Sequence, residues 1–231
     1  MQTESPLVSV LLRSLDRPEL PRALAAIEAQ TWRPIEIVFV DAGATGLSLE
    51  GRTQLPVVRV SPAKRLLRSP AMNAALDAAH GEWIVFLDED DSWEPSHVTE
   101  LVAAAIASAS GVAYSQTRLL ANDDELIRLL GGPFRRDLLI RSNYLSSNAV
   151  LFSRRFVDMG HRFDLSYECF EDWDFWMQLL QHGDFAYTGH ATASYYPEAG
   201  ESASGGGANL DRDLALRQRD KLMRKWSPPT H

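Results

Sequence analysis

Strand-like apolar runs alternate with helical patterns through the first half of the chain. The runs are rich in Val, Ile, Leu and Phe, are too short for helices, and lie at 7–12, 35–40, 57–60 and 83–87. Between and after them, apolar residues recur at helical spacing over 18–30, 70–80 and 95–108. Runs that are apolar on both faces and separated by helices are typical of a parallel sheet. The pattern therefore predicts an α/β fold.

The second half has a more mixed pattern, and we expect it to extend the same sheet. Strands are predicted at 148–152 and 191–196, and a helix is predicted from about Glu171 to Gly183. The Gly-Gly-Pro sequence at 131–133 indicates a loop.

Two segments near the C-terminus carry open interpretations. Residues 200–207 contain four glycines and are either a lid over a binding site or a plain linker. Residues 210–226 form a basic amphipathic pattern, for which a membrane-facing helix and a solvated helix face both fit.

The composition fits one large globular domain or a domain with a small subdomain. With 231 residues, 45% of them hydrophobic, the chain can bury a substantial core, and its one cysteine, Cys169, excludes an internal disulfide. The N-terminal residues lack the pattern of a signal peptide, and no apolar run approaches the roughly 20 residues of a membrane span. A formal net charge of -8 argues against sequence-independent binding to nucleic acid. We therefore expect a cytoplasmic protein whose contacts with phosphate are local.

Four consecutive carboxylates, Asp88 to Asp91, follow the apolar run that ends at Leu87. Crowded like charges repel one another, so a fold that keeps them usually supplies a cation or uses one carboxylate as a proton carrier. Oxygen ligands favour Mg²⁺ or Mn²⁺, and Mg²⁺ is commonly shared between one or two carboxylates and substrate phosphates. The cluster therefore predicts a metal site beside a phosphate ester. The alternative is an acidic turn that caps the helix starting near Pro95, although a cap needs only one Asp.

A second acidic cluster combines three carboxylates with four aromatic side chains at 170–176. If a helix begins here, Glu171 and Asp174 share one face and Asp172 points elsewhere, so the carboxylates can have different roles. Partial burial beside a tryptophan would raise the pKa of an Asp toward that of a general base, and aromatic faces can stack on a sugar. The alternative is that Asp172 caps the helix and the aromatic residues belong to the core.

Three segments are expected to meet at one edge of the sheet. Residues 13–17, Asp41 and the carboxylates at 88–91 each follow a predicted parallel strand. Ligands of such sheets bind beyond the carboxyl ends of the strands. The sequence therefore predicts one shared crevice.

The order of these motifs resembles that of family 2 glycosyltransferases, from about Val8 to Ser204. The matching segments are 8–12, 17–20 and 29–31 at the family's opening, 38–41 at the strand whose Asp reads the donor base, 71–73 and 81–83 before the Asp-x-Asp motif at 88–90, and 163–164 and 171–174 on the acceptor side.

The resemblance implies the GT-A fold, with a Rossmann-like, mostly parallel central sheet flanked by helices and a mixed C-terminal half. It implies a single domain over 1–231, with a nucleotide-sugar half at about 7–110, an acceptor half at about 111–208 and a basic helix at 209–231.

The resemblance also implies an activity: inverting transfer of a sugar from a nucleotide diphosphate sugar to a hydroxyl of a glycan or lipid-linked acceptor, assisted by Mn²⁺ or Mg²⁺. A UDP-sugar is the first choice of donor, with dTDP- or GDP-sugars as alternatives. A basic C-terminal helix would allow peripheral contact with the inner face of a membrane.

The resemblance assigns roles to particular residues. Asp172 is the catalytic base, and Asp90 and Asp88 bind the metal. The donor-binding residues are Ser14, Asp16, Arg17, Asp41, Arg68, Asn73, Asp88 and Glu89. The acceptor-binding residues are Glu171, Trp173, Asp174 and Trp176.

The chain departs from the family pattern at three places. The opening reads Arg-Ser-Leu-Asp at 13–16, where the family usually has Pro-Thr-Tyr-Asn. Met72 stands where an Arg commonly contacts the diphosphate, a role that Arg65 or Arg68 can fill. The late His of the metal site is replaced by the sequence at 196–199. We therefore expect weak metal affinity in the absence of nucleotide.

Other classes of protein remain open at this stage. A sugar nucleotidyltransferase would have a glycine-rich phosphate loop near the first strand, and residues 13–17 contain no glycine. A noncatalytic module that binds nucleotide sugar or glycan within a larger assembly would explain the altered opening and Met72.

Overall fold

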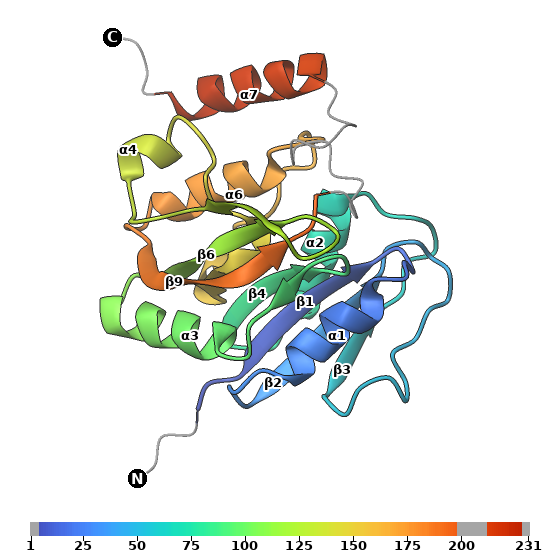
Figure 1. The fold of residues 1–231 in the computed structure, drawn as a ribbon. Helices are drawn as coiled ribbons and strands as arrows, with labels where there is room; N and C mark the ends of the chain where they lie inside the picture. The colour runs from blue at the N-terminus through green and yellow to red at the C-terminus, as the bar shows by residue number, and fades with distance from the viewer. Residues whose placement is uncertain (1–4, 198–211, 228–231) are drawn as a thin grey trace.

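The computed structural model describes residues 5–197 and 212–227. The first half of the chain builds a parallel sheet with helices against it (Figure 1). The parallel strands of this half are β1 (Val8–Ser14), β2 (Ile35–Asp41), β3 (Val57–Val60) and β4 (Trp83–Asp88). The helices that join or follow them are α1 (Leu20–Glu28), α2 (Arg68–Ala78) and α3 (His97–Ser108). The predicted α/β architecture is confirmed.

Alternate residues of the central strands pack against different helices. In β1, Val10 and Leu12 join the core that contains α1 and α3, whereas Leu11 joins the core that contains α2. Because both faces are covered, the strands are apolar along their length, which explains the continuous runs in the sequence. The carboxyl ends of β1 and β4 carry Ser14 and Asp88 to the same edge of the sheet.

The second half of the chain extends this sheet. Its strands are β5 (Ser92–Trp93), β6 (Val112–Leu120), β7 (Leu126–Leu130), β8 (Val150–Ser153) and β9 (Ala186–Tyr195). Among the described residues the strand order is β3-β2-β1-β4-β8-β6-β9-β5, and β7 pairs with the free part of β6. Strand β8 is antiparallel to both β4 and β6, and it connects the two halves.

Helical segments of the second half cover the face that α2 also covers. They are α4 (Arg136–Leu139), α5 (Arg155–Asp158), α6 (Glu171–Leu180) and α7 (Arg212–Trp226). The 3₁₀ turn η1 (Ser147–Ala149) instead places Ala149 in the core that contains α1 and α3. Helix α6 buries Trp173 and Trp176 in this core, and α7 lies on the outside of α6 (Figure 1).

Most predicted elements are present, with shifted ends. Strand 191–196 is the second part of the longer β9, and strand 148–152 begins with the turn η1. Strands β6 and β7 were not predicted. The glycine-rich segment 200–207 lies outside the described residues. No helix in the described ranges 5–197 and 212–227 is long and apolar enough to span a bilayer.

Candidate active site

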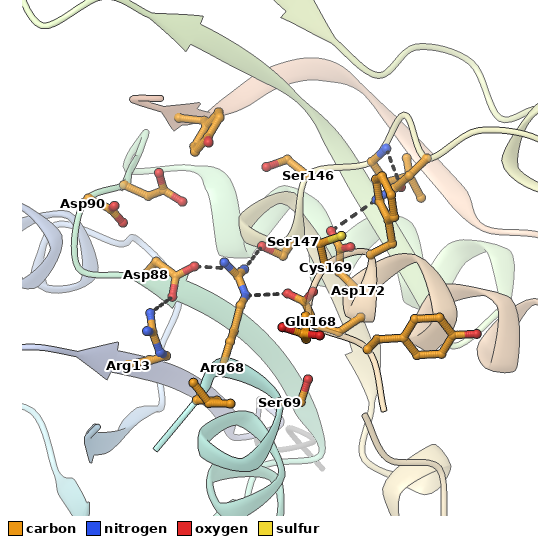
Figure 2. Close-up of a pocket in the computed structure, with 18 of the residues that line it drawn as sticks. Arg13, Arg68, Ser69, Asp88, Asp90, Ser146, Ser147, Glu168, Cys169 and Asp172 are labelled. Atoms are coloured by element: carbon orange, nitrogen blue, oxygen red, sulfur yellow. Dashed lines mark hydrogen bonds and ion pairs between the residues drawn. The ribbon is translucent and has the colours of Figure 1, made fainter. Parts of the chain in front are cut away.

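A cavity of about 540 Å³ opens at the carboxyl ends of β1 and β4 (Figure 2). Its volume lies within the range that proteins use to bind small-molecule ligands. Residues from both halves line it, including the acidic turn after β4, the start of α2 and the start of α6. Two of the three segments that were predicted to converge, 13–17 and 88–91, therefore meet at this cavity, whereas Asp41 does not line it, and α6 forms an additional wall.

The acidic turn after β4 forms a compact carboxylate cluster. Asp91 N–H donates to the Asp88 carbonyl at 3.1 Å, which folds the four residues into a tight turn. Asp88, Asp90 and Asp91 each offer one oxygen, and these three oxygens lie within 4.8 Å of one another. The Oδ1 atoms of Asp88 and Asp91 are buried without a hydrogen-bond partner. This oxygen-only donor set is one that could hold Mg²⁺ or Mn²⁺.

Burial and crowding raise the pKa values in this cluster. Burial, followed by the charge of Asp88, raises the pKa of Asp90 to about 6. Burial and the charges of Asp90 and Asp88 raise the pKa of Asp91 well above its usual range. Ionised carboxylates are therefore costly here unless a cation compensates them.

Three arginines provide that compensation in the structure. Arg13 Nη1 lies 3.5 Å from Asp88 Oδ1, and Arg17 Nη1 lies 3.2 Å from Asp90 Oδ2. Arg68 Nη2 lies 2.9 Å from Asp88 Oδ2. All three guanidinium groups line the cavity, so the site is ready for an anionic ligand as well as for a cation.

Arg68 connects the two walls of the cavity. Its Nη2 contacts Asp88 on the sheet side, and its Nε lies 2.9 Å from Glu171 Oε1 on α6 (Figure 2). Nη2 also donates to Ser147 Oγ at 2.8 Å. The charges of Asp88 and Glu171 outweigh the effect of burial and raise the pKa of Arg68 further, so this side chain stays cationic.

The first turn of α6 supplies the carboxylates of the opposite wall. The chain enters the helix through Phe170, whose φ of 63° turns Glu171 and Asp172 toward the cavity. Asp172 Oδ2 accepts a hydrogen bond from Asn143 Nδ2 at 3.2 Å, and its Oδ1 accepts from the Trp173 N–H at 2.7 Å. Carboxylates in a first turn are favoured by the positive end of the helix dipole.

Burial also raises the pKa values of this pair. The pKa of Glu171 rises to about 7 because burial and the nearby Asp172 outweigh the charge of Arg68. Burial raises the pKa of Asp172 as well, although Arg68 and hydrogen bonds from Trp173 and Asn143 oppose it. Asp172 is thus a partly exposed carboxylate with the raised basicity that proton abstraction requires.

Glu89 points away from the cavity and holds the loop after β1. Its Oε1 accepts from the Leu15 N–H at 2.8 Å, and its Oε2 accepts from Ser14 Oγ at 2.5 Å and from the Arg17 N–H at 3.0 Å. Direct donor contacts of Glu89 and Ser14 stay predictions that this arrangement does not favour, because the Glu89 carboxylate already accepts from Ser14 Oγ and from the N–H groups of Leu15 and Arg17. The pair instead sets the position of Arg17.

Three further predicted donor-binding residues lie away from the cavity lining. Asp41 is 2% exposed, and its carboxylate accepts hydrogen bonds from Thr45 and Gly46 of its own turn. The Asn73 amide exchanges two hydrogen bonds with the backbone of Phe163. Asp16 is exposed within the loop that Glu89 holds.

Three predicted acceptor-binding residues are buried in the core. Trp173 and Trp176 are 1% and 0% exposed, and Trp173 Nε1 donates to the Leu139 carbonyl at 2.7 Å. Asp174 is 0% exposed and pairs with Lys225 of α7. The assignment of these side chains to the acceptor stays a prediction that this arrangement does not support, because only Glu171 and Asp172 of α6 line the cavity. The expected grouping was wrong: Glu171 shares the cavity with Asp172, and Asp174 points toward α7.

The sequence interpretation also missed residues that line the cavity. Asp91 was recognised as part of the acidic run but was not assigned as a ligand, although the run itself was the signal. Arg13 and Asn143 contact the two acidic groups. Leu67 and Leu165 line the cavity with exposed fractions of 74% and 64%, and an isolated leucine in a loop gives no sequence signal.

The family model described as Glycosyl transferase family 2 matches residues 9–156. The chain belongs to this family and is a glycosyltransferase. It is 27% identical over 182 residues to a PGL/p-HBAD biosynthesis glycosyltransferase of Mycobacterium tuberculosis, which covers 74% of this chain and 68% of the relative. It is 26% identical over 230 residues to the uncharacterized glycosyltransferase YwdF of Bacillus subtilis, which covers 94% of this chain and 82% of the relative.

Solved structures with the same fold support this placement. Residues 1–349 of Staphylococcus aureus TarS in complex with UDP-GlcNAc align with a TM-score of 0.72 at 16% identity, over 96% of this chain and 71% of that chain. The Pyrobaculum calidifontis mannosyltransferase PcManGT in complex with GDP-Man and Mn²⁺ aligns with a TM-score of 0.68 at 17% identity, over 96% and 65%. In a second crystal structure of TarS 1–349, the alignment with this chain covers 60% of the TarS chain. The predicted GT-A fold is confirmed.

Proposed function

We propose that this glycosyltransferase moves a sugar from a nucleoside diphosphate sugar to an acceptor hydroxyl, with inversion at the anomeric carbon and with help from Mn²⁺ or Mg²⁺. One observation carries the proposal. The carboxylate cluster after β4 and Asp172 on α6 line one cavity from different walls, and Arg68 lies between them. The two walls fit a charged leaving group on one side and a proton acceptor on the other.

The acidic turn fits a divalent cation. Asp88, Asp90 and Asp91 offer three oxygens within 4.8 Å, and two buried Oδ1 atoms lack hydrogen-bond donors. When bound, the cation would act as a Lewis acid that neutralises the leaving diphosphate. Three protein oxygens leave coordination positions for phosphate oxygens and water, which fits a metal that binds together with the donor.

Arginines beside the cluster would bind the diphosphate directly. Arg13, Arg17 and Arg68 line the cavity and already contact the carboxylates, so a phosphate could exchange for these contacts. Arg68 is better placed than Arg65 to fill the role lost at Met72, because Arg68 lines the cavity whereas Arg65 is exposed outside its lining.

Asp172 would take the proton from the acceptor hydroxyl as that oxygen attacks the anomeric carbon opposite the leaving group. The proton passes to an Asp172 oxygen, the new glycosidic bond forms, and the bond to the diphosphate breaks in the same displacement. A raised pKa supports the proton transfer. One displacement of this kind inverts the anomeric configuration and needs no covalent intermediate.

The acceptor side combines apolar and polar groups. Leu67 and Leu165 are largely exposed at the cavity, close in sequence to Arg68 and to α6, while Asn143 and Ser146 offer hydrogen bonds. This supports an acceptor with an apolar portion next to its reacting hydroxyl, as a lipid-linked acceptor has. The exposed arginines of α7 would allow such an enzyme to act at the anionic inner face of a membrane.

Structural neighbours guide the choice of donor to test. TarS is solved with UDP-GlcNAc, and PcManGT with GDP-Man and Mn²⁺. We place UDP-sugars first and GDP- and dTDP-sugars next. Asp41, whose carboxylate is held by its own turn, would contact a base only after that turn rearranges.

The proposal is tested by donor turnover. The purified chain is incubated with UDP-, GDP- and dTDP-sugars and with alkyl or aryl glycoside acceptors, in Mn²⁺, in Mg²⁺ and in EDTA, and the released nucleoside diphosphate is measured. We expect release with one donor class, dependence on the metal and stimulation by an acceptor. Nucleotide binding without release under every condition would favour a noncatalytic binding module instead.

A further inference from the structure

Helix α7 is tied to the acceptor side through Lys225. Lys225 Nζ lies 2.8 Å from Asp174 Oδ1 and 2.9 Å from Asp164 Oδ2, so one ammonium group bridges α6 and the preceding loop. Trp226 Nε1 donates to the same Asp174 oxygen at 2.9 Å. Asp174 is 0% exposed, and burying a carboxylate costs free energy unless it is paired and hydrogen-bonded, as it is here by Lys225 and Trp226.

The loop at 164–170, which we call the acceptor loop, receives a second contact from α7. Lys221 Nζ donates to the Ser166 carbonyl at 2.7 Å and lies 4.4 Å from the centre of the Tyr167 ring. The acceptor loop has little regular structure of its own, and Leu165, Tyr167 and Cys169 of this loop line the cavity. Contacts from α7 therefore help to set its position, together with the core packing of Tyr167 and Cys169.

The acceptor loop leads directly into the catalytic end of α6. Its last residue, Phe170, is followed by Glu171 and Asp172, and Asp174 lies in the same first turn. A side chain that fixes both Asp164 and Asp174 therefore fixes the two ends of the segment that carries Asp172. The hydrogen bonds to these two carboxylates outweigh partial burial and raise the pKa of Lys225, which keeps it charged.

We propose that Lys225 is a positioning residue for the acceptor reaction. By bridging Asp164 and Asp174, it holds the acceptor loop and Asp172 in the arrangement that binds the acceptor and places its hydroxyl next to Asp172. The inference rests on the proposed function. It gives α7 a role that neither a membrane-facing helix nor a solvated helix face includes, because the ammonium groups of Lys221 and Lys225 contact the acceptor loop and α6.

The test compares Lys225→Met with Arg224→Met, which removes the same charge from an exposed neighbour on α7. Lys225→Arg restores the charge. Each variant is assayed for acceptor KM and kcat, for nucleoside diphosphate affinity and for donor hydrolysis without acceptor. Hydrogen exchange of residues 164–174 gives a readout that does not depend on activity. Lys221→Met, which removes one contact to the loop, replaces Lys225→Met if the latter does not fold.

For Lys225→Met we expect the acceptor kcat/KM to fall roughly 10- to 100-fold, the scale of a small misplacement of reacting groups. Nucleotide affinity and donor hydrolysis stay within about twofold, exchange of 164–174 accelerates, and Lys225→Arg recovers part of the acceptor kcat/KM. Two results overturn the proposal: behaviour equal to that of Arg224→Met, or an equal fall in donor and acceptor parameters. Failure of the proposed function is distinct, because it removes donor hydrolysis and nucleotide binding from the unmodified chain while the exchange comparison still reports on Lys225.

Discussion

The two acidic groups that face the cavity are built differently. On the sheet side, Asp88, Asp90 and Asp91 crowd into one turn, and guanidinium groups of three arginines surround them. On the helix side, Glu171 and Asp172 begin α6 and face a single arginine. Under the proposed function, the first group would bind a metal ion in exchange for its arginine contacts, whereas the second would keep a carboxylate basic enough to accept a proton.

Arg68 contacts both acidic groups. Its guanidinium contacts Asp88 on one side and Glu171 on the other, so a ligand that takes Arg68 from the sheet side also changes the charge around α6. Substitutions on the sheet side, on the helix side or at Arg68 can therefore test whether the two walls have different roles.

The largest effect is expected from the helix side alone. Asp172→Asn removes the proposed proton acceptor but keeps the shape of the side chain, so we expect transfer to fall by about 100- to 10,000-fold. Nucleoside diphosphate affinity should remain within about threefold. Asn143→Ala, which removes a hydrogen bond to Asp172, should cost less. Transfer at the normal rate in Asp172→Asn would mean that another group is the base.

At the link, Arg68→Met is expected to affect both walls. Loss of the charge should raise the donor KM on the order of 10- to 100-fold and also lower kcat, because Glu171 and Asp88 lose their shared cation. Arg65→Met, an exposed neighbour outside the cavity lining, is the matched control. Steady-state kinetics in donor and acceptor separate the two effects. A change confined to donor KM would show that the walls act independently.

A smaller effect is expected at the apolar rim. Leu165→Ser should raise the KM for acceptors that carry an alkyl or aryl group about three- to tenfold, since roughly 1 kcal/mol of apolar contact is lost. It should leave the KM for polar glycan acceptors and for donor unchanged. Leu216→Ser, an exposed leucine of α7, controls for the loss of surface hydrophobicity. Equal changes for polar and apolar acceptors would argue against a lipid-linked acceptor.

The smallest effect concerns stability and pH on the helix side. Glu171 has a pKa near 4.3 when unfolded and a pKa raised to about 7 by burial in the folded protein. The folded state therefore binds this proton more tightly than the unfolded state does. The protonated Glu171 contributes to the free energy of unfolding in full below about pH 4, and this contribution is lost as the pH rises toward 7. Glu171→Gln should remove this component, which we put at roughly 1 to 3 kcal/mol.

Thermal unfolding between pH 5 and 8 without metal tests this expectation. The wild-type melting temperature should fall more steeply with pH than that of Glu171→Gln, while the exposed Glu168→Gln should follow the wild type. Parallel profiles for wild type and Glu171→Gln would show that the folded protein compensates the Glu171 charge fully.

The first half of the fold could be predicted from the sequence because the burial of its strands is visible in short stretches of the chain. Strands β1, β2 and β4 are buried on both faces and therefore appear as continuous apolar runs. Strand β7 is mostly exposed, and β6 and β9 shift register against each other. None of these three strands therefore shows a clear alternation of apolar and polar residues. The second sheet half was consequently predicted only in part.

The candidate site was predictable where one residue type dominates a short segment. The carboxylates at 88–91 and at 171–172 could be found this way, and all of them except Glu89 line the cavity. The roles of Glu89 and Trp173 could not, because the orientation of a side chain in a turn or helix depends on the surrounding fold. Glu89 holds the β1 loop, and Trp173 fills the core.

The most direct test of the account is the change in melting temperature with UDP, GDP and dTDP, each with and without Mn²⁺, in wild type, Asp91→Asn and Asp172→Asn. A ligand that binds the folded state raises the melting temperature by mass action. The account predicts a rise for one nucleotide that requires Mn²⁺, is kept in Asp172→Asn and is lost in Asp91→Asn. A metal-independent rise, or one that survives in Asp91→Asn, would contradict the assignment of the sheet side to metal and diphosphate.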